Sequence, residues 1–272
     1  EKPQADESGV RNVLSSQNEK RVRVDRRDYV ALVMLTESAL NRAMIEELIQ
    51  AFTALQKDSG VRAVVLTGAE EVFSAGAGIE EMTAWTPEQA QEFARAGQSL
   101  TGLIENLGKP VIAAVNGLAA GGGCELALAC AWRIASPKAS FALPEVSAGF
   151  LPGFGSASRL AGIISKARAL EMILSGEAIQ AKEALRIGLV NRVPDKSEEL
   201  LTVSLTLAEQ ICRNAPLAVK YAIETINHGG RLSLEDGLRL ESAFFGLCFA
   251  TRDVEEGTKA FLEKRPPVFT GQ

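Results

Sequence analysis

Three consecutive glycines followed by a carboxylate form the stretch of this chain whose residue types suggest chemistry. Gly121 to Gly123 and then Glu125 lie between an apolar strand-like run, 110–115, and an apolar helix-like run, 126–130, and Glu145 follows in another apolar setting. Glycines let a ligand approach backbone N–H groups closely, and a helix start offers unpaired donors and a positive dipole end. The pattern therefore predicts an oxyanion site beside two carboxylates.

Composition and charge limit the classes of function. The chain has 272 residues, a net charge of −5 and 46% hydrophobic residues, which suit a globular protein with a sizeable core. The pI of about 5.2 and the lack of a dense Lys/Arg cluster argue against a nucleic-acid partner. No apolar run approaches the roughly 20 residues that cross a bilayer, so we expect no membrane partner.

Histidine and cysteine usage argues against a metal site. The single histidine, His228, excludes a multi-histidine site and disfavours a nucleophile–histidine triad. The four cysteines lack metal-ligand spacing and are expected to be reduced, as in a reducing compartment.

The polar N-terminus does not resemble a signal peptide. We therefore expect a cytoplasmic protein, or one of the mitochondrial matrix if a eukaryotic transit peptide has been removed.

The expected elements follow a repeated strand–strand–helix order. Residues 1–19 carry few large apolar side chains and are expected to form a flexible arm. Three units follow, at 21–57, 62–106 and 111–130, and Thr86 is expected to cap the helix of the second unit. Such a repeat predicts a stacked spiral rather than a doubly wound sheet.

The remaining expected elements are short strands and, beyond residue 155, mostly helices. We expect a small-residue loop at 73–79 and strands at 132–136, 140–143 and 189–193. The segment 233–250 is apolar on more than one face, so it needs cover from another subunit or lobe. The other helices are expected at 165–174, 181–187, 198–214, 216–227 and 253–264.

An ordered set of motifs resembles the crotonase superfamily, and within it the enoyl-CoA hydratases. Taken singly, Glu125 fits a helix-start carboxylate, Glu145 an ordinary loop residue, and the glycines close packing. Their joint occurrence in family order favours a site. The resemblance covers nearly everything from about Arg21 onward and is carried by Phe73-Ser74-Ala75-Gly76-Ala77, Pro110 to Gly117, Gly121 to Ala127, and Phe141-Ala142-Leu143-Pro144-Glu145.

The resemblance implies an α/β fold and an assembly. It implies a crotonase-like spiral of β-β-α units with the active site over residues 20–197, and a helical C-terminal trimerisation region over 198–272. A homotrimer or a dimer of trimers would follow. The substrate would be an acyl-CoA thioester, and the resemblance implies no metal and no organic cofactor, because coenzyme A is part of the substrate.

The resemblance also implies roles for individual residues. The backbone N–H groups of Ala77 and Gly122 would form the oxyanion hole, Glu125 and Glu145 would be the catalytic carboxylates, and Gly153 would supply an N–H near the attacking water. Residues that would contact coenzyme A are Ala39, Leu40, Ala75, Ile79 and, from a neighbouring subunit, Lys264.

Hydration of an enoyl-CoA suits these groups. The reaction pushes negative charge onto the thioester oxygen, and two N–H donors there lower the barrier. We cast Glu145 as the acid at the α-carbon and Glu125 as the group that holds the water, a division that the sequence leaves open. A double-bond isomerase, a hydrolase or a decarboxylase would use the same oxyanion hole, but an isomerase typically needs one carboxylate. A non-catalytic RNA-binding relative is disfavoured by the acidic pI.

Several positions depart from the usual pattern of the family. Gly78 and Ala131 stand where an aspartate is common, the turn before Ala39 is shorter than usual, and residues 155–159 replace a Gly-Gly-Thr-Gln-Arg run. None of these changes removes a catalytic group, but the lack of a carboxylate at Gly78 and Ala131 is expected to alter the edges of the acyl pocket. The acyl group can therefore be straight, branched or cyclic.

Overall fold

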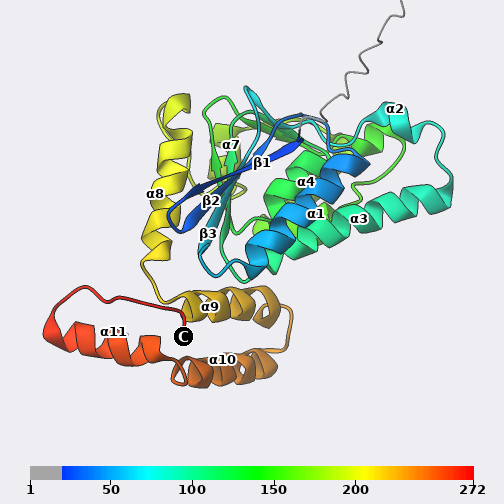
Figure 1. Cartoon of the computed structure of the whole chain (residues 1–272). Helices are drawn as coiled ribbons and strands as arrows, with labels where there is room; N and C mark the ends of the chain where they lie inside the picture. The colour runs from blue at the N-terminus through cyan, green and yellow to red at the C-terminus, as the bar shows by residue number, and fades with distance from the viewer. Residues whose placement is uncertain (1–19) are drawn as a thin grey trace, which may run out of the picture.

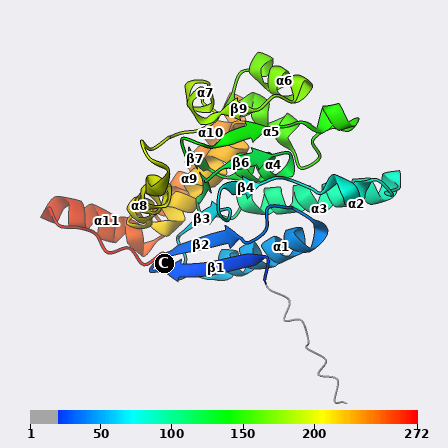
Figure 2. The same cartoon turned by 90° about the horizontal axis from the view of Figure 1, so that it is seen from above.

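From β3 to β8, each turn of the spiral adds one strand to each of two sheets. The computed structural model describes residues 20–272, so the expected arm at 1–19 lies outside the described residues. The first sheet has the order β1-β2-β3-β5-β7 and the second the order β4-β6-β8-β9. The successive pairs β3 and β4, β5 and β6, and β7 and β8 join their sheets in parallel, which is the expected spiral (Figures 1 and 2).

The strands of both sheets are short, and most of their residues are buried. The bounds in the first sheet are β1 Val22–Arg27, β2 Val30–Leu35, β3 Ala63–Thr67, β5 Val111–Val115 and β7 Trp132–Ala135. Those in the second are β4 Val72–Ser74, β6 Leu118–Ala120, β8 Ser140–Ala142 and β9 Ile179–Gln180.

The helices of the spiral lie around these sheets. They are α1 Arg42–Lys57, α2 Ile79–Met82, α3 Pro87–Glu105, α4 Gly122–Ala129, the 3-10 turn η1 Glu145–Ala148, α5 Ser156–Ile163, α6 Lys166–Ser175 and α7 Ala181–Arg186. The expected cap of α3 is confirmed, because Thr86 Oγ1 accepts the Gln89 backbone N–H and Gln89 Oε1 accepts the Thr86 backbone N–H. Helices α1 and α3 pack side by side (Figure 2).

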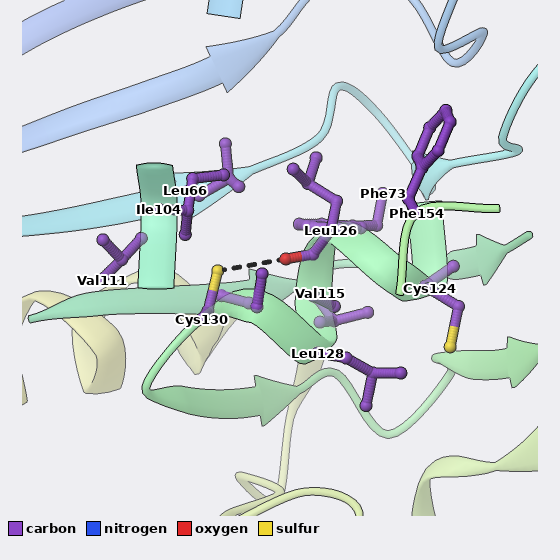
Figure 3. Packing of buried hydrophobic residues seen from close by; sticks show 14 of the residues in the cluster. Leu66, Phe73, Ile104, Val111, Val115, Cys124, Leu126, Leu128, Cys130 and Phe154 are labelled. Carbon is purple, nitrogen blue, oxygen red and sulfur yellow. Dashed lines mark hydrogen bonds between the residues drawn. The ribbon is translucent and has the colours of Figure 1, made fainter. Parts of the chain in front are cut away.

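The core has two parts, one on each face of the first sheet. On one face, α1, α3 and α4 bury a large cluster that includes Phe52, Phe73 and Leu126. Figure 3 shows part of this cluster around α4, where the Cys130 thiol donates to the Leu126 carbonyl at 3.4 Å. On the other face, α8 (Leu200–Cys212), which follows the turn η2 Ser197–Glu199, covers the sheet with Leu205. Apolar side chains therefore cover both faces of the first sheet.

The last three helices extend away from the sheets. They are α9 Pro216–Gly229, α10 Leu234–Cys248 and α11 Arg252–Glu263, and they lie below the spiral in Figure 1. No side chain of α9 or α10 is buried in the single chain. Phe245 is 67% exposed and Phe261 82%. This outer face of the C-terminal helices lacks cover, as the apolar pattern of 233–250 predicts.

Three of the expectations about elements are wrong. The expected loop at 73–79 begins with β4, and the helix expected from residue 126 already begins at Gly122, inside the glycine run. The expected strand at 189–193 forms only one bridge, between Arg192 and Ile134. There the Asn191 side chain accepts the Arg133 N–H at 2.9 Å, a position that a strand carbonyl would hold in a ladder.

No helix among residues 20–272 combines the length and apolar character needed to cross a membrane.

Candidate active site

The glycine run lets α4 begin against the end of β4. Gly121 has a φ of +51°, which disfavours a side chain, and turns the chain from β6 into the helix. A Cβ at Gly123 would lie 2.3 Å from the Ser74 carbonyl oxygen, so only glycine allows this packing. Every residue of α4 is buried. The first N–H groups of the helix are therefore held in place at the end of the second sheet.

The loop after β4 lies directly beside the start of α4. A Cβ added at Gly76 would be 3.0 Å from the Gly122 nitrogen, which puts the loop and the helix start in contact. The loop is anchored on its other side, because Ala75 N–H donates to the Ser38 carbonyl at 2.8 Å and Leu40 N–H donates to the Gly76 carbonyl at 2.9 Å. Ala77 and Gly122, the two expected oxyanion donors, both line one cavity.

That cavity has a volume of about 710 Å³ and is mostly apolar. Its walls come from the loop after β4, from α2 and the start of α3, from the start of α4, and from the segment 144–154. Trp85 and Phe93 form part of the wall, with their ring centroids 4.8 Å apart. The carboxylates of Glu125 and Glu145 are the acidic groups that line it among the described residues. The two expected catalytic carboxylates therefore face the same space.

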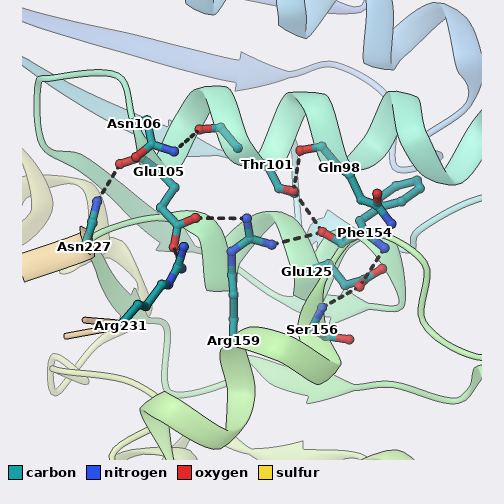
Figure 4. Close-up of polar contacts among 11 residues, drawn as sticks. Gln98, Thr101, Glu105, Asn106, Glu125, Phe154, Ser156, Arg159, Asn227 and Arg231 are labelled. Carbon is teal, nitrogen blue, oxygen red and sulfur yellow. Dashed lines mark hydrogen bonds and ion pairs between the residues drawn. The ribbon is translucent and has the colours of Figure 1, made fainter. Parts of the chain in front are cut away.

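Glu125 is buried and held by a backbone turn. Its Oε1 accepts the N–H groups of Phe154 at 2.9 Å and of Ser156 at 2.8 Å (Figure 4). Burial raises the pKa of the Glu125 carboxyl, and the N–H groups of Ser156, Phe154 and Gly155 oppose that rise because they stabilise the charged form. The turn thus fixes one carboxylate oxygen and leaves the group oriented toward the cavity.

Glu145 has a different environment at the start of η1. It is 8% exposed, and its Oε2 has no hydrogen-bond partner among residues 20–272. Burial raises the pKa of the Glu145 carboxyl to about 7, its own backbone N–H lowers it, and the charge of Glu125 raises it further. A carboxyl in this setting exchanges a proton near neutral pH.

The structure brings most of the predicted site residues together. Ala75, Ala77, Ile79, Gly122, Glu125, Glu145 and Gly153 all line the cavity. The Gly153 carbonyl accepts a bond from Gln98 Nε2 at 2.9 Å, which holds this residue at the cavity wall. Gly78, the first departure from the family pattern, caps α2 and directly precedes the lining residue Ile79.

Three predicted contacts lie apart from the cavity in the single chain. Ala39 and Leu40 lie behind the loop after β4, where Ala39 pairs with Gly76 and Leu40 is 1% exposed. Lys264 directly follows α11, and α11 and α2 lie on opposite sides of the molecule in both views (Figures 1 and 2).

One expectation about the acyl pocket is wrong. Ala131 does not reach the cavity that holds the carboxylates. It lines a separate, smaller cavity between the sheet and α9, because the strand β7 leads away from the site at this point.

The residues that support Glu125 are not among those that the sequence predicts. Phe154 and Ser156 bind Glu125 through their backbone N–H groups, so their side-chain types do not indicate this contact. The pattern Pro152-Gly153-Phe154-Gly155 does predict a turn, and its glycines are the one sign of a close backbone approach. Among the described residues, no cluster of histidine, cysteine, aspartate and glutamate has the arrangement of a metal site.

Comparisons with known proteins identify the family. The family model for enoyl-CoA hydratase/isomerase matches residues 26–272. A short-chain-enoyl-CoA hydratase of Clostridium acetobutylicum is 44% identical over 229 residues, which are 84% of this chain and 87% of that protein. A crotonyl-CoA hydratase of Syntrophomonas wolfei is 42% identical over 233 residues, 85% of this chain and 89% of that protein.

Solved structures agree with this assignment. The crystal structure of an enoyl-CoA hydratase from Bacillus anthracis matches with a TM-score of 0.90 and 37% identity, over 93% of this chain and 100% of that chain. The spiral fold expected from the repeat is therefore confirmed. The chain belongs to the enoyl-CoA hydratase/isomerase family, within the crotonase superfamily that its motifs resemble.

Proposed function

We propose that this protein is an enoyl-CoA hydratase, which adds water across the 2,3 double bond of an enoyl-CoA thioester. The observation that carries the proposal is the pair of buried carboxylates, Glu125 and Glu145, in one apolar cavity. Relatives named as hydratases, at 42–44% identity, support the same reaction. An isomerase would need only one such carboxylate, so the pair favours hydration.

The thioester oxygen would bind between the N–H groups of Ala77 and Gly122. Negative charge develops on this oxygen when water attacks the conjugated double bond. Donors fixed by α4 and by the loop after β4 need no reorganisation at that moment, and one such donor contributes about 2.7–4 kcal/mol to the lowering of the barrier. The contact between Gly76 and Gly122 supports this placement of the two donors.

The two carboxylates would divide the proton transfers. Glu145, with its pKa near 7, would donate a proton to the α-carbon, while the water oxygen bonds to the β-carbon. Glu125, already fixed by two N–H groups, would orient the water and accept its proton. Transfer of that proton to Glu145 restores the starting state. Gly153 would hold the water through its N–H.

The substrate would enter as coenzyme A thioester at the mouth of the cavity. Ala75 and Ile79 line the cavity, and Ile79 is 58% exposed, as expected for a residue at the entrance. Ala39 and Leu40, directly behind this loop, would contact the nucleotide part, and Lys264 of a neighbouring subunit would reach the phosphates. Addition of water does not oxidise the substrate and does not transfer a group to a carrier, so the reaction balances without a metal or an organic cofactor.

We propose a homotrimer, or a dimer of trimers, built through residues 198–272. The uncovered apolar side chains of α9 to α11 support an interface there, because so much exposed apolar surface is unusual in a monomer. The spiral, residues 20–197, would carry the active site. A cytoplasmic location remains the expectation from the sequence. Light scattering on the purified protein tests the assembly, and a monomeric mass would contradict it.

Crotonyl-CoA tests the reaction. Hydration removes the absorbance of the conjugated thioester, so we expect that absorbance to fall and a 3-hydroxyacyl-CoA to form. The same assay with straight, branched and cyclic enoyl-CoA esters defines the acyl group. If the purified protein hydrates none of them, the proposed function is wrong. Migration of a double bond without hydration would identify an isomerase, and release of free coenzyme A a hydrolase.

A further inference from the structure

Arg159, on α5, lies behind the turn that holds Glu125. Its Nη1 donates to the Phe154 carbonyl at 3.0 Å, and its Nη2 pairs with Glu105 Oε2 at 3.1 Å (Figure 4). The Arg159 side chain is 13% exposed and that of Glu105 17%. An ion pair shielded to this degree is screened less by solvent than a surface pair. Arg159 is therefore well placed to fix the turn.

The turn presents opposite faces to Glu125 and to Arg159. The N–H groups of Phe154 and Ser156 point to Glu125, while the Phe154 carbonyl between them accepts from Arg159 and, at 2.9 Å, from Thr101 Oγ1. Gly155 makes this reversal possible with a φ of +106°. Any Cβ at Gly155 would lie 2.4 Å from Arg159 Nη1. The arginine thus fills the space that a side chain at 155 would occupy.

The ion pair continues to the C-terminal helices. Glu105 Oε1 accepts from Arg231 Nη2 at 3.0 Å, and the Glu105 main-chain carbonyl accepts from Asn227 Nδ2 at 2.8 Å. Asn227 belongs to α9, and Arg231 follows it in the connection to α10. A continuous chain of polar contacts therefore joins the C-terminal helices to the carboxylate in the cavity.

We propose that Arg159 is a positioning residue for the reaction: it fixes the Phe154–Ser156 turn whose N–H groups orient Glu125, and Glu105 with Arg231 ties that turn to the C-terminal helices. This inference rests on the proposed function, because it takes Glu125 to be catalytic. Arg159 itself lies behind the turn and acts through the backbone.

The proposal makes a specific statement about the charge on Glu125. Without Arg159 the turn loses one of two donors to the Phe154 carbonyl and a nearby cation, so the carboxylate is less well stabilised. Among the described residues, the other titratable groups that interact electrostatically with Glu125 are Glu145 from η1 and the adjacent Cys124 thiol. Burial raises the pKa of Cys124, so it stays neutral. Glu125 should therefore protonate at higher pH in a variant that lacks Arg159.

Three variants and one control test this. Arg159→Met keeps a side chain of similar length but removes the charge and the hydrogen bonds to Phe154 and Glu105. Arg159→Lys keeps the charge, and Thr101→Val removes the second donor to the Phe154 carbonyl. Arg186→Met, in an exposed ion pair with Glu183, is the matched control. We expect Arg159→Met to lower kcat about 10- to 100-fold with little change in KM, as misplacement of a catalytic group does. The acidic limb of its pH profile moves to higher pH, and Arg159→Lys restores part of both.

Titration of Glu125 gives a readout that needs no turnover. The carboxyl carbon signal of labelled glutamate, assigned with Glu125→Gln, reports its protonation in each folded variant. A shift to higher pH in Arg159→Met and Thr101→Val supports the proposal even if no enoyl-CoA is hydrated, in which case only the proposed function fails. Unchanged titration and an unchanged acidic limb in the folded variants would overturn the proposal, whatever the loss of stability. If Arg159→Met does not fold, Arg159→Lys and Thr101→Val decide by the same criteria.

Discussion

Glu125 and Glu145 face the same cavity, but the regions that carry them are built differently. Glu125 lies in the fully buried helix α4, and one of its oxygens accepts two backbone N–H groups from the turn at Phe154 and Ser156. Glu145 begins the short turn η1, and one of its oxygens has no partner within residues 20–272. The first carboxylate is held as an acceptor, while the second is free to carry a proton.

The difference shows that environment, and not residue type, divides the roles. Both groups are glutamates, and burial raises the pKa of both carboxyls. Backbone N–H groups from another segment oppose that effect at Glu125, whereas Glu145 receives only its own N–H. Two groups of one type can then serve as the acceptor and the donor of a single reaction.

The largest expected effect is the loss of turnover when either carboxylate becomes an amide. Glu125→Gln and Glu145→Gln keep the side-chain volume but remove a general base or a general acid. We expect each to lower kcat for crotonyl-CoA hydration by about 10²- to 10⁴-fold, the usual range for such groups. Binding of the coenzyme A ester should persist, because neither side chain holds the nucleotide; calorimetry with an acyl-CoA product measures this.

The control for this pair is Glu171→Gln, in an exposed ion pair with Arg168 on α6. Its turnover should match that of the unmodified protein. If one of the two site variants keeps its turnover, only the other carboxylate takes part, and the symmetric view of the pair is wrong.

Glu145→Gln should lower turnover but should make the folded protein more stable at high pH. Its folded pKa of about 7 exceeds the usual value of 4.5, so the folded protein holds this proton more tightly than the unfolded chain. The resulting stabilisation is complete below pH 4.5 and is lost as the pH rises to 7, by about 3 kcal/mol. Glu145→Gln cannot ionise and avoids this loss.

Urea unfolding at a fixed protein concentration measures the effect. The stability of Glu145→Gln relative to the unmodified protein should rise from pH 5 to pH 8, so that an inactive variant is the more stable one at pH 8. Glu171→Gln should show no such rise. A constant difference across this range would mean that Glu145 is ionised in the folded protein throughout.

Most of the spiral could be predicted from the sequence because the patterns that indicate its strands and helices are local. The strand–strand–helix unit at 21–57 and the Thr86 cap of α3 each depend on neighbouring residues, and the structure confirms both, the bounds of the unit within one or two positions. The segment 189–193 has apolar residues at three of its five positions, yet the Asn191 side chain takes the place of a ladder carbonyl. That contact comes from a distant strand, so no local pattern reveals it.

The site was less predictable than the fold. Glycines and carboxylates mark Gly122, Glu125 and Glu145 by type, and the structure brings them to one cavity. The turn that separates the roles of the two carboxylates acts through main-chain N–H groups, which every residue but proline possesses. Its position relative to Glu125 depends on how α5 packs against α4, and that is fixed only in three dimensions.

The smallest expected effect is the electrostatic influence of one carboxylate on the other. In the unmodified protein, kcat/KM for subsaturating crotonyl-CoA should fall about tenfold per unit above pH 7, as the proton on Glu145 is lost. The charge of Glu125 is one cause of that high pKa, but burial is the larger cause.

In Glu125→Gln, therefore, the pKa of Glu145 should decrease and yet stay above 4.5. The carboxyl carbon signal of labelled glutamate measures it without turnover, and Glu171→Gln provides the reference. An unchanged pKa would show that the carboxylates titrate independently, so that burial alone distinguishes Glu145. A decrease all the way to 4.5 would show instead that repulsion between the carboxylates, and not the unpartnered position of Glu145, keeps the proton there.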